Sequence, residues 1–243
     1  MRTDGKSMIG QALARRSAAP TCTPCTLAGA DLLLHPAGVA FHGGTGTLVV
    51  ADLHLEKATA FAARGQMLPP YETLESLRRL TRVTQEFLPR RLVLLGDSFH
   101  SRHHVLAENS AAIGLIEGLA RAAELNWIAG NHDPELPLDL PGRCAPEMML
   151  EGITLRHAPV ADGATEMVGH LHPVASLATR AGRQRRKCFV LSGQRLLMPA
   201  FGALTGGIGV TDPLIARWFE EPDARAFLLC RDRLQTVPLA ALT

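Results

Sequence analysis

Four short clusters of acidic, amide and imidazole side chains occur in a fixed order along this chain of 243 residues, and three of them directly follow an apolar run. Carboxylate, amide oxygen and imidazole nitrogen are the groups that bind divalent cations of intermediate softness. The clusters are Asp52-Leu53-His54, Gly96-Asp97-Ser98-Phe99-His100, Gly130-Asn131-His132-Asp133 and Gly169-His170-Leu171-His172. Their residue types and spacing predict metal chemistry.

Six side chains from these clusters and the separate His157 supply three oxygen and four nitrogen donors: Asp52, Asp97, Asn131, His54, His157, His170 and His172. Two divalent ions about 3.5–4 Å apart need roughly this number of ligands when one carboxylate is shared between them. Residues two apart in an extended segment point the same way, so each Asp-x-His or His-x-His pair can hold one ion. Because no cysteine lies in any cluster, we expect Mn²⁺, Fe²⁺ or Zn²⁺ rather than a thiolate zinc site or an all-oxygen Ca²⁺ site.

Each cluster by itself is weak evidence. A Gly-Asp pair after a strand is a turn more often than a metal ligand, by about four to one, and a single histidine such as His157 is usually a surface or core residue. The argument depends on the conjunction, because six of the ten histidines lie in the four clusters or at position 157.

The elements that must position the clusters alternate between strand and helix. Apolar runs at 48–51, 92–95 and 125–129 have strand length, and helical patterns at about 69–87 and 105–124 lie between them. Such alternation predicts parallel strands joined by right-handed crossovers. Because open α/β sheets bind ligands beyond the carboxyl ends of their strands, the first three clusters should meet at one edge.

The pattern changes after His132. Short strand-like runs follow without helices, at 148–150, 153–156, 167–169, 174–177, 188–191, 195–198, 226–230 and 234–237. Strands without intervening helices predict a second, largely antiparallel sheet packed on the first. Before the first cluster, residues 31–43 are predicted to form a hairpin.

Composition and charge limit the class of protein. With 47% hydrophobic and 20% charged residues the chain has ample core for a globular protein, and a net charge of +2 indicates no partner by itself. We expect one domain over residues 28–243 and a flexible arm over residues 1–27. Five scattered cysteines, two of them in a lone Cys22-x-x-Cys25, indicate free thiols and a cytoplasmic protein. No run approaches the ~18 apolar residues of a membrane-spanning helix, and no oligomeric state follows from the sequence.

Taken together, the clusters resemble a known family pattern. The order Asp-x-His, Gly-Asp-x-x-His, Gly-Asn-His-Asp, a later lone histidine and Gly-His-x-His is similar to the five blocks of the calcineurin-like metallophosphoesterases, over residues about 30–200. The resemblance implies an α/β fold of two mixed β-sheets packed as a sandwich and flanked by helices.

The resemblance also implies a role for each residue. One metal ion would be held by Asp52, His54 and His172, and the second by Asn131, His157 and His170. Asp97 would bridge the two ions. His132 would be the transition-state acid, oriented by Asp133, and His100 would contact a phosphate oxygen or line the site.

Several local spellings are more similar to one branch, the bacterial ligase-associated DNA damage response endonucleases. These spellings are Asp52-Leu53-His54-Leu55-Glu56-Lys57, Gly96-Asp97-Ser98-Phe99-His100 and Gly169-His170-Leu171-His172-Pro173. The resemblance implies a phosphodiesterase that uses two Mn²⁺ ions and cleaves DNA, which we expect to be single-stranded. It also implies a place in DNA repair alongside a DNA ligase, a helicase and an exonuclease.

The expected reaction is hydrolysis of a phosphodiester bond. Two metal ions lower the pKa of a bridging water toward neutrality, which gives a hydroxide nucleophile, and His132 stabilises or protonates the leaving oxygen. One alternative is an enzyme of the same fold that acts on small phosphomonoesters, cyclic nucleotides or a lipid-linked pyrophosphate. An alternative of another class is a scaffold that has lost catalysis, against which the filled ligand positions argue.

A basic stretch follows the last cluster and places five cations in eight residues: Arg180, Arg183, Arg185, Arg186 and Lys187. A charge run alone is more often a solvated loop, by about two to one. Because this stretch lies between two predicted strands and soon after His172, we expect a hairpin loop whose cations contact the phosphate backbone of DNA.

Overall fold

The first sheet is formed by the N-terminal half of the chain, and its seven strands follow one another in sequence order. The computed structural model describes residues 21–62, 65–67, 71–100, 110–135, 140–179 and 182–242. The strands are β1 (Thr23–Leu27), β2 (Ala30–His35), β3 (Val39–His42), β4 (Thr47–Val50), β5 (Arg91–Leu95), β6 (Glu124–Ile128) and β7 (Arg143–Ala145). β1 to β4 pair antiparallel and β4 to β7 pair parallel, which confirms the predicted hairpin and parallel strands.

The helices of this half connect the parallel strands. They are α2 (Lys57–Ala62), α3 (Glu72–Phe87) and α4 (Ser110–Ala122). The predicted start of α3 at 69–70, and residues 105–109 of the other predicted helix, lie outside the described residues. α4 ends two residues earlier than predicted, because Glu124 already begins β6.

The second sheet is formed by the rest of the chain. Its strands are β8 (Glu147–Leu150), β9 (Ile153–Arg156), β10 (Glu166–Val168), β11 (Pro173–Thr179), β12 (Gly182–Leu191), β13 (Arg195–Leu197), β14 (Ile208–Gly209), β15 (Arg225–Leu229) and β16 (Leu234–Pro238), followed by a 3₁₀ turn, η3 (Leu239–Ala241). Most pairs are antiparallel, as predicted, but β10 lies parallel to both β9 and β13, and β11 lies parallel to β14. The sheet is therefore mixed.

Side chains alternate along the strands of the first sheet and so build two cores. Val50 and Leu94 belong to the core formed with α3 and α4, whereas Val49 and Val93 face the second sheet and pack in the same core as Phe189. A one-residue slip would turn these apolar sets outward, so burial fixes the strand register and the residue at which each strand ends.

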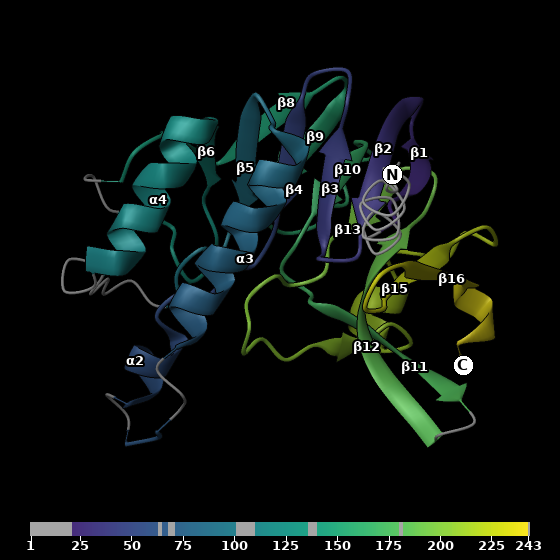
Figure 1. Ribbon diagram of the computed structural model, residues 1–243. Coiled ribbons are helices and arrows are strands. Elements are labelled where there is room, and N and C mark those ends of the chain that lie inside the picture. The colour runs from purple at the N-terminus through teal and green to yellow at the C-terminus, as the bar shows by residue number, and fades with distance from the viewer. Residues whose placement is uncertain are drawn as a thin grey trace, which may run out of the picture.

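A third core lies on the other face of the second sheet, where Val190 and Leu228 pack with Ile215 of the short helix α5 (Pro213–Ala216). The layers are therefore helices, sheet, sheet and a smaller helical layer (Figure 1). This arrangement confirms the predicted α/β sandwich of two mixed sheets.

The N-terminal boundary differs from the prediction. Residues 1–20 of the expected flexible arm lie outside the described residues. Thr23–Leu27 is strand β1 and pairs with β2 along its whole length, so the arm prediction is wrong for these residues. Cys25 lies in this strand, and burial raises the pKa of its thiol to about 12. No helix in the described part of the chain is long and apolar enough to span a membrane.

Candidate metal centre

Every predicted metal ligand lies in the turn just beyond the end of a strand. The first sheet contributes three turns, with Asp52 and His54 after β4, Asp97 after β5 and Asn131 after β6. The second sheet contributes His157 after β9, and His170 and His172 after β10. The site therefore lies where the two layers of the sandwich meet at their strand ends.

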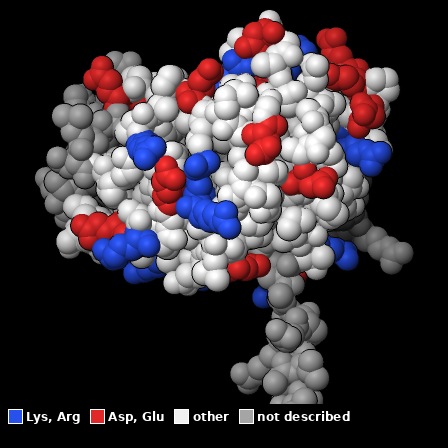
Figure 2. Space-filling view, turned by 90° about the horizontal axis from the view of Figure 1, so that it is seen from above, with Lys and Arg blue, Asp and Glu red and all other residues white. Residues whose placement is uncertain are grey.

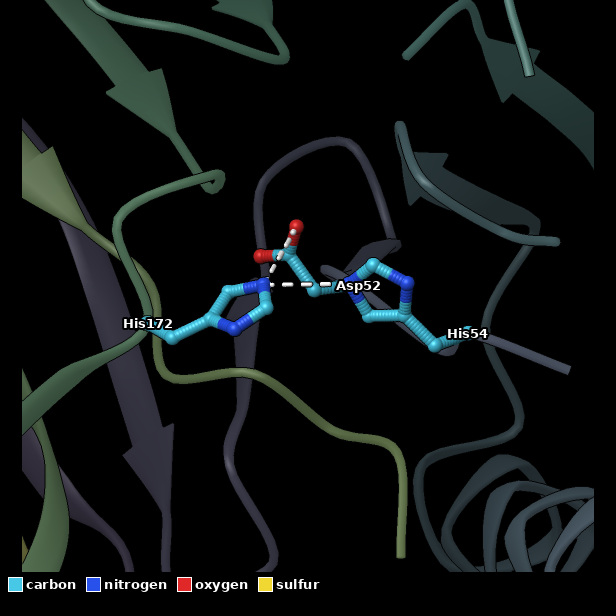
Figure 3. Close-up of side chains that lie close together, drawn as sticks. All are labelled: Asp52, His54 and His172. Atoms are coloured by element: carbon cyan, nitrogen blue, oxygen red, sulfur yellow. Dashed lines mark hydrogen bonds and ion pairs between the residues drawn. The ribbon is translucent and has the colours of Figure 1, made fainter. Parts of the chain in front are cut away.

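Asp52, His54 and His172 form the first group of donors (Figure 3). The Nε2 atoms of the two histidines face each other at 3.1 Å. The Nε2 atom of His172 also lies 3.3 Å from Oδ1 of Asp52. These three side chains come from both sheets and converge on one point.

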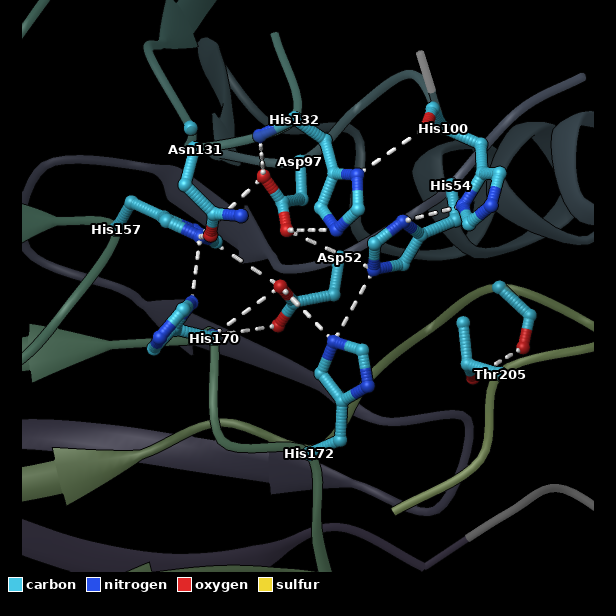
Figure 4. Close-up of polar contacts among 12 residues, drawn as sticks. Asp52, His54, Asp97, His100, Asn131, His132, His157, His170, His172 and Thr205 are labelled. Atoms are coloured by element: carbon cyan, nitrogen blue, oxygen red, sulfur yellow. Dashed lines mark hydrogen bonds and ion pairs between the residues drawn. The ribbon is translucent and has the colours of Figure 1, made fainter. Parts of the chain in front are cut away.

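Asp97, His157 and His170 form the second group (Figure 4). The Nε2 atom of His157 lies 3.4 Å from Oδ1 of Asp97 and 3.2 Å from Nδ1 of His170. Oδ1 of Asn131 lies 3.0 Å from the same His157 nitrogen, so the amide joins this group.

Asp97 connects the two groups. While its Oδ1 faces His157, its Oδ2 lies 3.7 Å from Nε2 of His54 in the first group. Asp52 is also close to both, since its Oδ1 lies 3.8 Å from Nδ1 of His157. A carboxylate between two sets of imidazoles has the position that a shared ligand requires.

The donors fit two divalent cations. Two neutral imidazole nitrogens that face each other share at most one proton, so the pairs His54–His172 and His157–His170 direct nitrogen lone pairs at their neighbours. Divalent ions beside the carboxylates would satisfy these lone pairs and offset the buried negative charge. The donor set of imidazole, carboxylate and amide favours Mn²⁺, Fe²⁺ or Zn²⁺.

Burial and neighbouring charges favour the metal-binding protonation states of His54, His170 and Asp97, whereas for His157 burial lowers the pKa but Asp97 and Asp52 raise it above its usual value. Burial, together with the neighbouring His172, lowers the pKa of His54 to about 2, and burial beside His157 also lowers the pKa of His170. For Asp97, burial alone would raise the pKa, but the hydrogen bond and charge of His157 and the main-chain N–H of His132 hold it below its usual range. Metal ligation requires neutral imidazole and ionised carboxylate.

The backbone is strained at the ligands. Five of them have φ in the left-handed region: Asp52 (54°), His54 (45°), Asp97 (45°), His170 (69°) and His172 (45°). A non-glycine residue held there costs roughly 1–3 kcal/mol, and such residues cluster at functional sites. The turns are shaped to aim these side chains rather than to relax the chain.

Three glycines of the clusters allow the close approach. A Cβ on Gly96 would collide with the ring of His157, one on Gly130 with the main chain and carboxylate of Asp97, and one on Gly169 with the carboxylate of Asp52. At these three turns the residue before the ligand must therefore lack a side chain, which explains the Gly-Asp, Gly-Asn and Gly-His spellings.

His132 stands at the rim of the site, and its side chain is 41% exposed. Its Nε2 lies 4.0 Å from Oδ2 of Asp97, and its Nδ1 lies 3.1 Å from the main-chain oxygen of His100. Nδ1 therefore donates to His100, which leaves Nε2 directed at the site.

Asp133 contacts main-chain groups of the neighbouring turns, so the orienting role predicted for it would act on His132 through these turns. Its carboxylate accepts hydrogen bonds from the main-chain N–H groups of Phe99 and Gly130, both at 3.0 Å. Burial, with the nearby Asp97, raises the pKa of Asp133 to about 6. The residue fastens the turns after β5 and β6 to each other, and the His100 carbonyl orients His132.

The basic stretch is a strand rather than a loop. Arg183, Arg185, Arg186 and Lys187 lie in β12, which pairs with β11 in a hairpin, and Arg180 lies outside the described residues. Alternation places Arg183, Arg185 and Lys187 on one strand face and Arg186 on the other. The three arginines are exposed.

Lys187 has a different role from the one predicted. Its ammonium donates to the carbonyl oxygens of Ala200 and Gly202, both at 2.8 Å, and to Oγ1 of Thr205 at 2.6 Å. Burial, with Arg79 nearby, lowers its pKa to about 8. All three ammonium protons are used inside the protein, so the structure does not support a phosphate contact by Lys187.

The segment 200–205, which Lys187 holds, was not foreseen as part of the site. The N–H groups of Phe201 and Gly202 donate to the carbonyls of Ala51 and Asp52, so this segment supports the first ligand turn. Two further cations bind its carbonyl oxygens, Lys57 at Leu204 and Arg79 at Phe201. The available sequence signal was the position of Lys187 next to the apolar Cys188-Phe189, which indicates the buried end of a strand.

Comparisons with known proteins include a strong similarity to a solved nuclease structure. No family model matches the chain, and no curated protein is significantly similar to it. Among solved structures, the nuclease MPE of Pseudomonas putida superposes with a TM-score of 0.68 at 30% sequence identity, over 89% of this chain and 100% of that chain. YfcE, a phosphoesterase from E. coli, aligns with a TM-score of 0.39 at 16% identity, over 81% of this chain and 94% of that one.

Proposed function

We propose that this chain, which belongs to the metallophosphoesterase family, is a nuclease that hydrolyses phosphodiester bonds of DNA. The family membership makes it a metal-dependent phosphoesterase. The observation that carries the proposal is that two groups of metal donors meet around Asp97 in a chain that is 30% identical to a nuclease over most of its length.

The chain's own residues divide the work of such a reaction. When bound, two divalent ions would supply an activated water and neutralise phosphate oxygens. We assign Asp52, His54 and His172 to one ion, Asn131, His157 and His170 to the other, and Asp97 to both. The strained turns hold these side chains in place before any ion binds, which lowers the cost of ordering them.

His132 is the proton donor in this proposal. Its Nδ1 donates to the His100 carbonyl, so Nε2 carries a proton only when the ring is an imidazolium, and that proton is the one available to a leaving oxygen on the site side. His100 also lines the site through its ring, since its Nδ1 lies 3.4 Å from Nδ1 of His54. The hydrogen bonds from Asp133 to the two neighbouring turns keep Nε2 of His132 about 4.0 Å from Oδ2 of Asp97.

DNA is the proposed substrate because exposed cations lie near the site. Arg183 and Arg185 share a strand face with Lys187, whose contacts reach the segment under Asp52. The β11–β12 hairpin lies at the lower end of the molecule in Figure 1. Figure 2 looks onto the upper end, where basic and acidic side chains are interspersed without a patch of one sign. A phosphodiester backbone would therefore be attracted to the hairpin rather than to that end.

Further parts of the proposal come from the resemblance. We propose Mn²⁺ as the metal, single-stranded DNA as the substrate, and a cytoplasmic role in bacterial DNA repair beside a ligase, a helicase and an exonuclease. A single domain is supported by the core that the two sheets share, and because this core includes Leu27 of β1 we place the start of the domain before the expected residue 28. A phosphomonoesterase of the same fold is the alternative, whereas the scaffold alternative is wrong because the chain is an enzyme.

The test is metal-dependent cleavage by the purified protein. We expect Mn²⁺ to support cleavage of single-stranded DNA and of bis-(p-nitrophenyl) phosphate, with little release of phosphate from p-nitrophenyl phosphate. Preference for the monoester, or DNA cleavage that persists in excess chelator, would contradict the proposal.

A further inference from the structure

A row of rings leads out of the metal centre to helix α2. The rings of His132 and His100 are stacked, with centroids 5.2 Å apart and planes at 19°. The ring of Phe61 also contacts His100, with centroids 5.5 Å apart and planes at 39°. Phe61 is half-buried, so part of the residue is accessible to solvent.

A cation accompanies Phe61 on the same helix. Lys57 lies one helical turn earlier, and its Nζ lies 5.7 Å from the centre of the Phe61 ring. One ammonium proton is used at the Leu204 carbonyl, at 2.9 Å, and within the described residues the other two have no hydrogen-bond partner. Ring and ammonium together offer one surface for a flat apolar group and one for an anion.

The start of α2 is fixed in place beside the metal ligands. The N–H of Glu56 donates to Oγ1 of Thr73 at 2.7 Å, and the N–H of Ala58 donates to Oε1 of Glu72 at 2.9 Å, both at the start of α3. The Lys57–Leu204 contact fastens the helix to the segment that supports Asp52. A group bound at Phe61 would therefore be held at a set distance from the metal centre.

We propose that Phe61 stacks on the nucleobase next to the scissile phosphate while Lys57 contacts the adjoining phosphate. These contacts would make the enzyme select single-stranded DNA, and the proposal rests on the proposed nuclease function. Base–aromatic stacking accepts every base because each has a π-face, and it requires a base that is not enclosed in a duplex. α2 and the β11–β12 hairpin both lie at the lower end of the molecule in Figure 1, on opposite sides of it.

The experiment compares a single-stranded oligothymidylate with a chain of the same length made of abasic residues, which keeps the phosphates and lacks the bases. For the native enzyme we expect the abasic chain to be cleaved with kcat/KM lower by on the order of tenfold, from the loss of one stacked base. The Phe61→Leu variant should lose this preference and cleave both chains at the native rate for the abasic chain. The Phe61→Trp variant, which keeps an aromatic face, should restore the preference.

Two results would overturn the stacking role. If Phe61→Leu slows both chains equally, the ring supports His100 rather than contacting the base. If the native preference for the chain with bases persists in Phe61→Leu, the base binds elsewhere. Failure of the nuclease proposal is distinguishable, because the native enzyme would then cleave neither chain with Mn²⁺ while still hydrolysing a nitrophenyl phosphomonoester.

Discussion

Asp97 carries more of the proposed chemistry than any other single residue, because each of its oxygens faces a different group of imidazoles. Asp97→Asn keeps the size and the acceptor for the His132 N–H, but an amide lacks the negative charge that holds two cations. We expect an intact fold and a large loss of kcat/KM. Removing a partner that only supports a metal ligand typically costs ~10–100-fold, and removing the ligand itself should cost more. Metal content and turnover of the purified variant measure this, with the exposed Asp31→Asn as control. Near-native turnover in a metal-replete Asp97→Asn variant would end the two-ion account.

His132 is accessible, and its role can be separated from metal binding. His132→Ala removes the proton donor at Nε2 and leaves Asn131 and Asp97 in place. We expect cleavage of DNA, which has a poor leaving group, to fall by roughly 10²–10⁴-fold. The loss on a nitrophenyl ester should be much smaller, because nitrophenolate leaves without protonation. Since His132 also lies with His54 and Asp97 in a third possible donor group, equal losses on both substrates together with loss of metal would make it a ligand.

At the scale of elements, the turn after β6 depends on the absence of a side chain at position 130. Gly130→Ala would drive a methyl group into Asp97 and into Oδ1 of Asp133. The turn must then shift, so we expect weaker metal binding and activity at least tenfold lower, in the range that displacement of a supporting group costs. Gly193→Ala is the matched control, because a Cβ there meets nothing within 4 Å. Equal metal affinity in the two variants would show that the turn adapts.

The hairpin of β11 and β12 offers a test of which strand face meets DNA. Arg183→Ala with Arg185→Ala removes two exposed cations from the face shared with Lys187. On single-stranded DNA we expect the slope of log affinity against log salt to flatten by about 1.4, or 0.7 per phosphate contact. Arg186→Ala, on the opposite face, should leave the slope unchanged, and none of the variants should affect nitrophenyl diesters. A flatter slope for Arg186→Ala alone would place the DNA on the other face.

The sequence predicted the ligand turns well and their surroundings poorly, for a physical reason. Strand-ending apolar runs and the Gly-Asp or Gly-Asn spellings are local signals, so Asp97 and Asn131 could be placed before the structure was known. The contacts of Lys187 are not local, because they depend on how the 200–205 segment packs against β12. A run of basic residues in the sequence identifies the cations, but it does not show which of them donate hydrogen bonds to carbonyl oxygens of the protein.

For the whole molecule, ions bound at the candidate metal centre would connect the two sheets. Asp52, His54, Asp97 and Asn131 come from the first sheet, and His157, His170 and His172 come from the second. Ions that bind only the folded state add stability, about 2.7 kcal/mol per site at 100 times the dissociation constant. The five ligands with strained backbone make the folded state depend further on this contribution.

Removal of the metal should therefore destabilise the entire fold rather than the site alone. Two occupied sites would add about 5 kcal/mol to the free energy of unfolding. At about 2–4 °C per kcal/mol for a chain of this size, the Tm should be about 10–20 °C higher in saturating Mn²⁺ than in chelator. Calorimetric scans measure the shift, and hydrogen exchange should show weaker protection in both sheets of the chelated protein, at the ends of β4, β5, β9 and β10. In Asp97→Asn the metal-dependent shift should largely vanish, because the carboxylate that connects the two groups has lost its charge. A shift of native size in that variant, or chelator effects confined to one sheet, would mean that the ions do not join the layers.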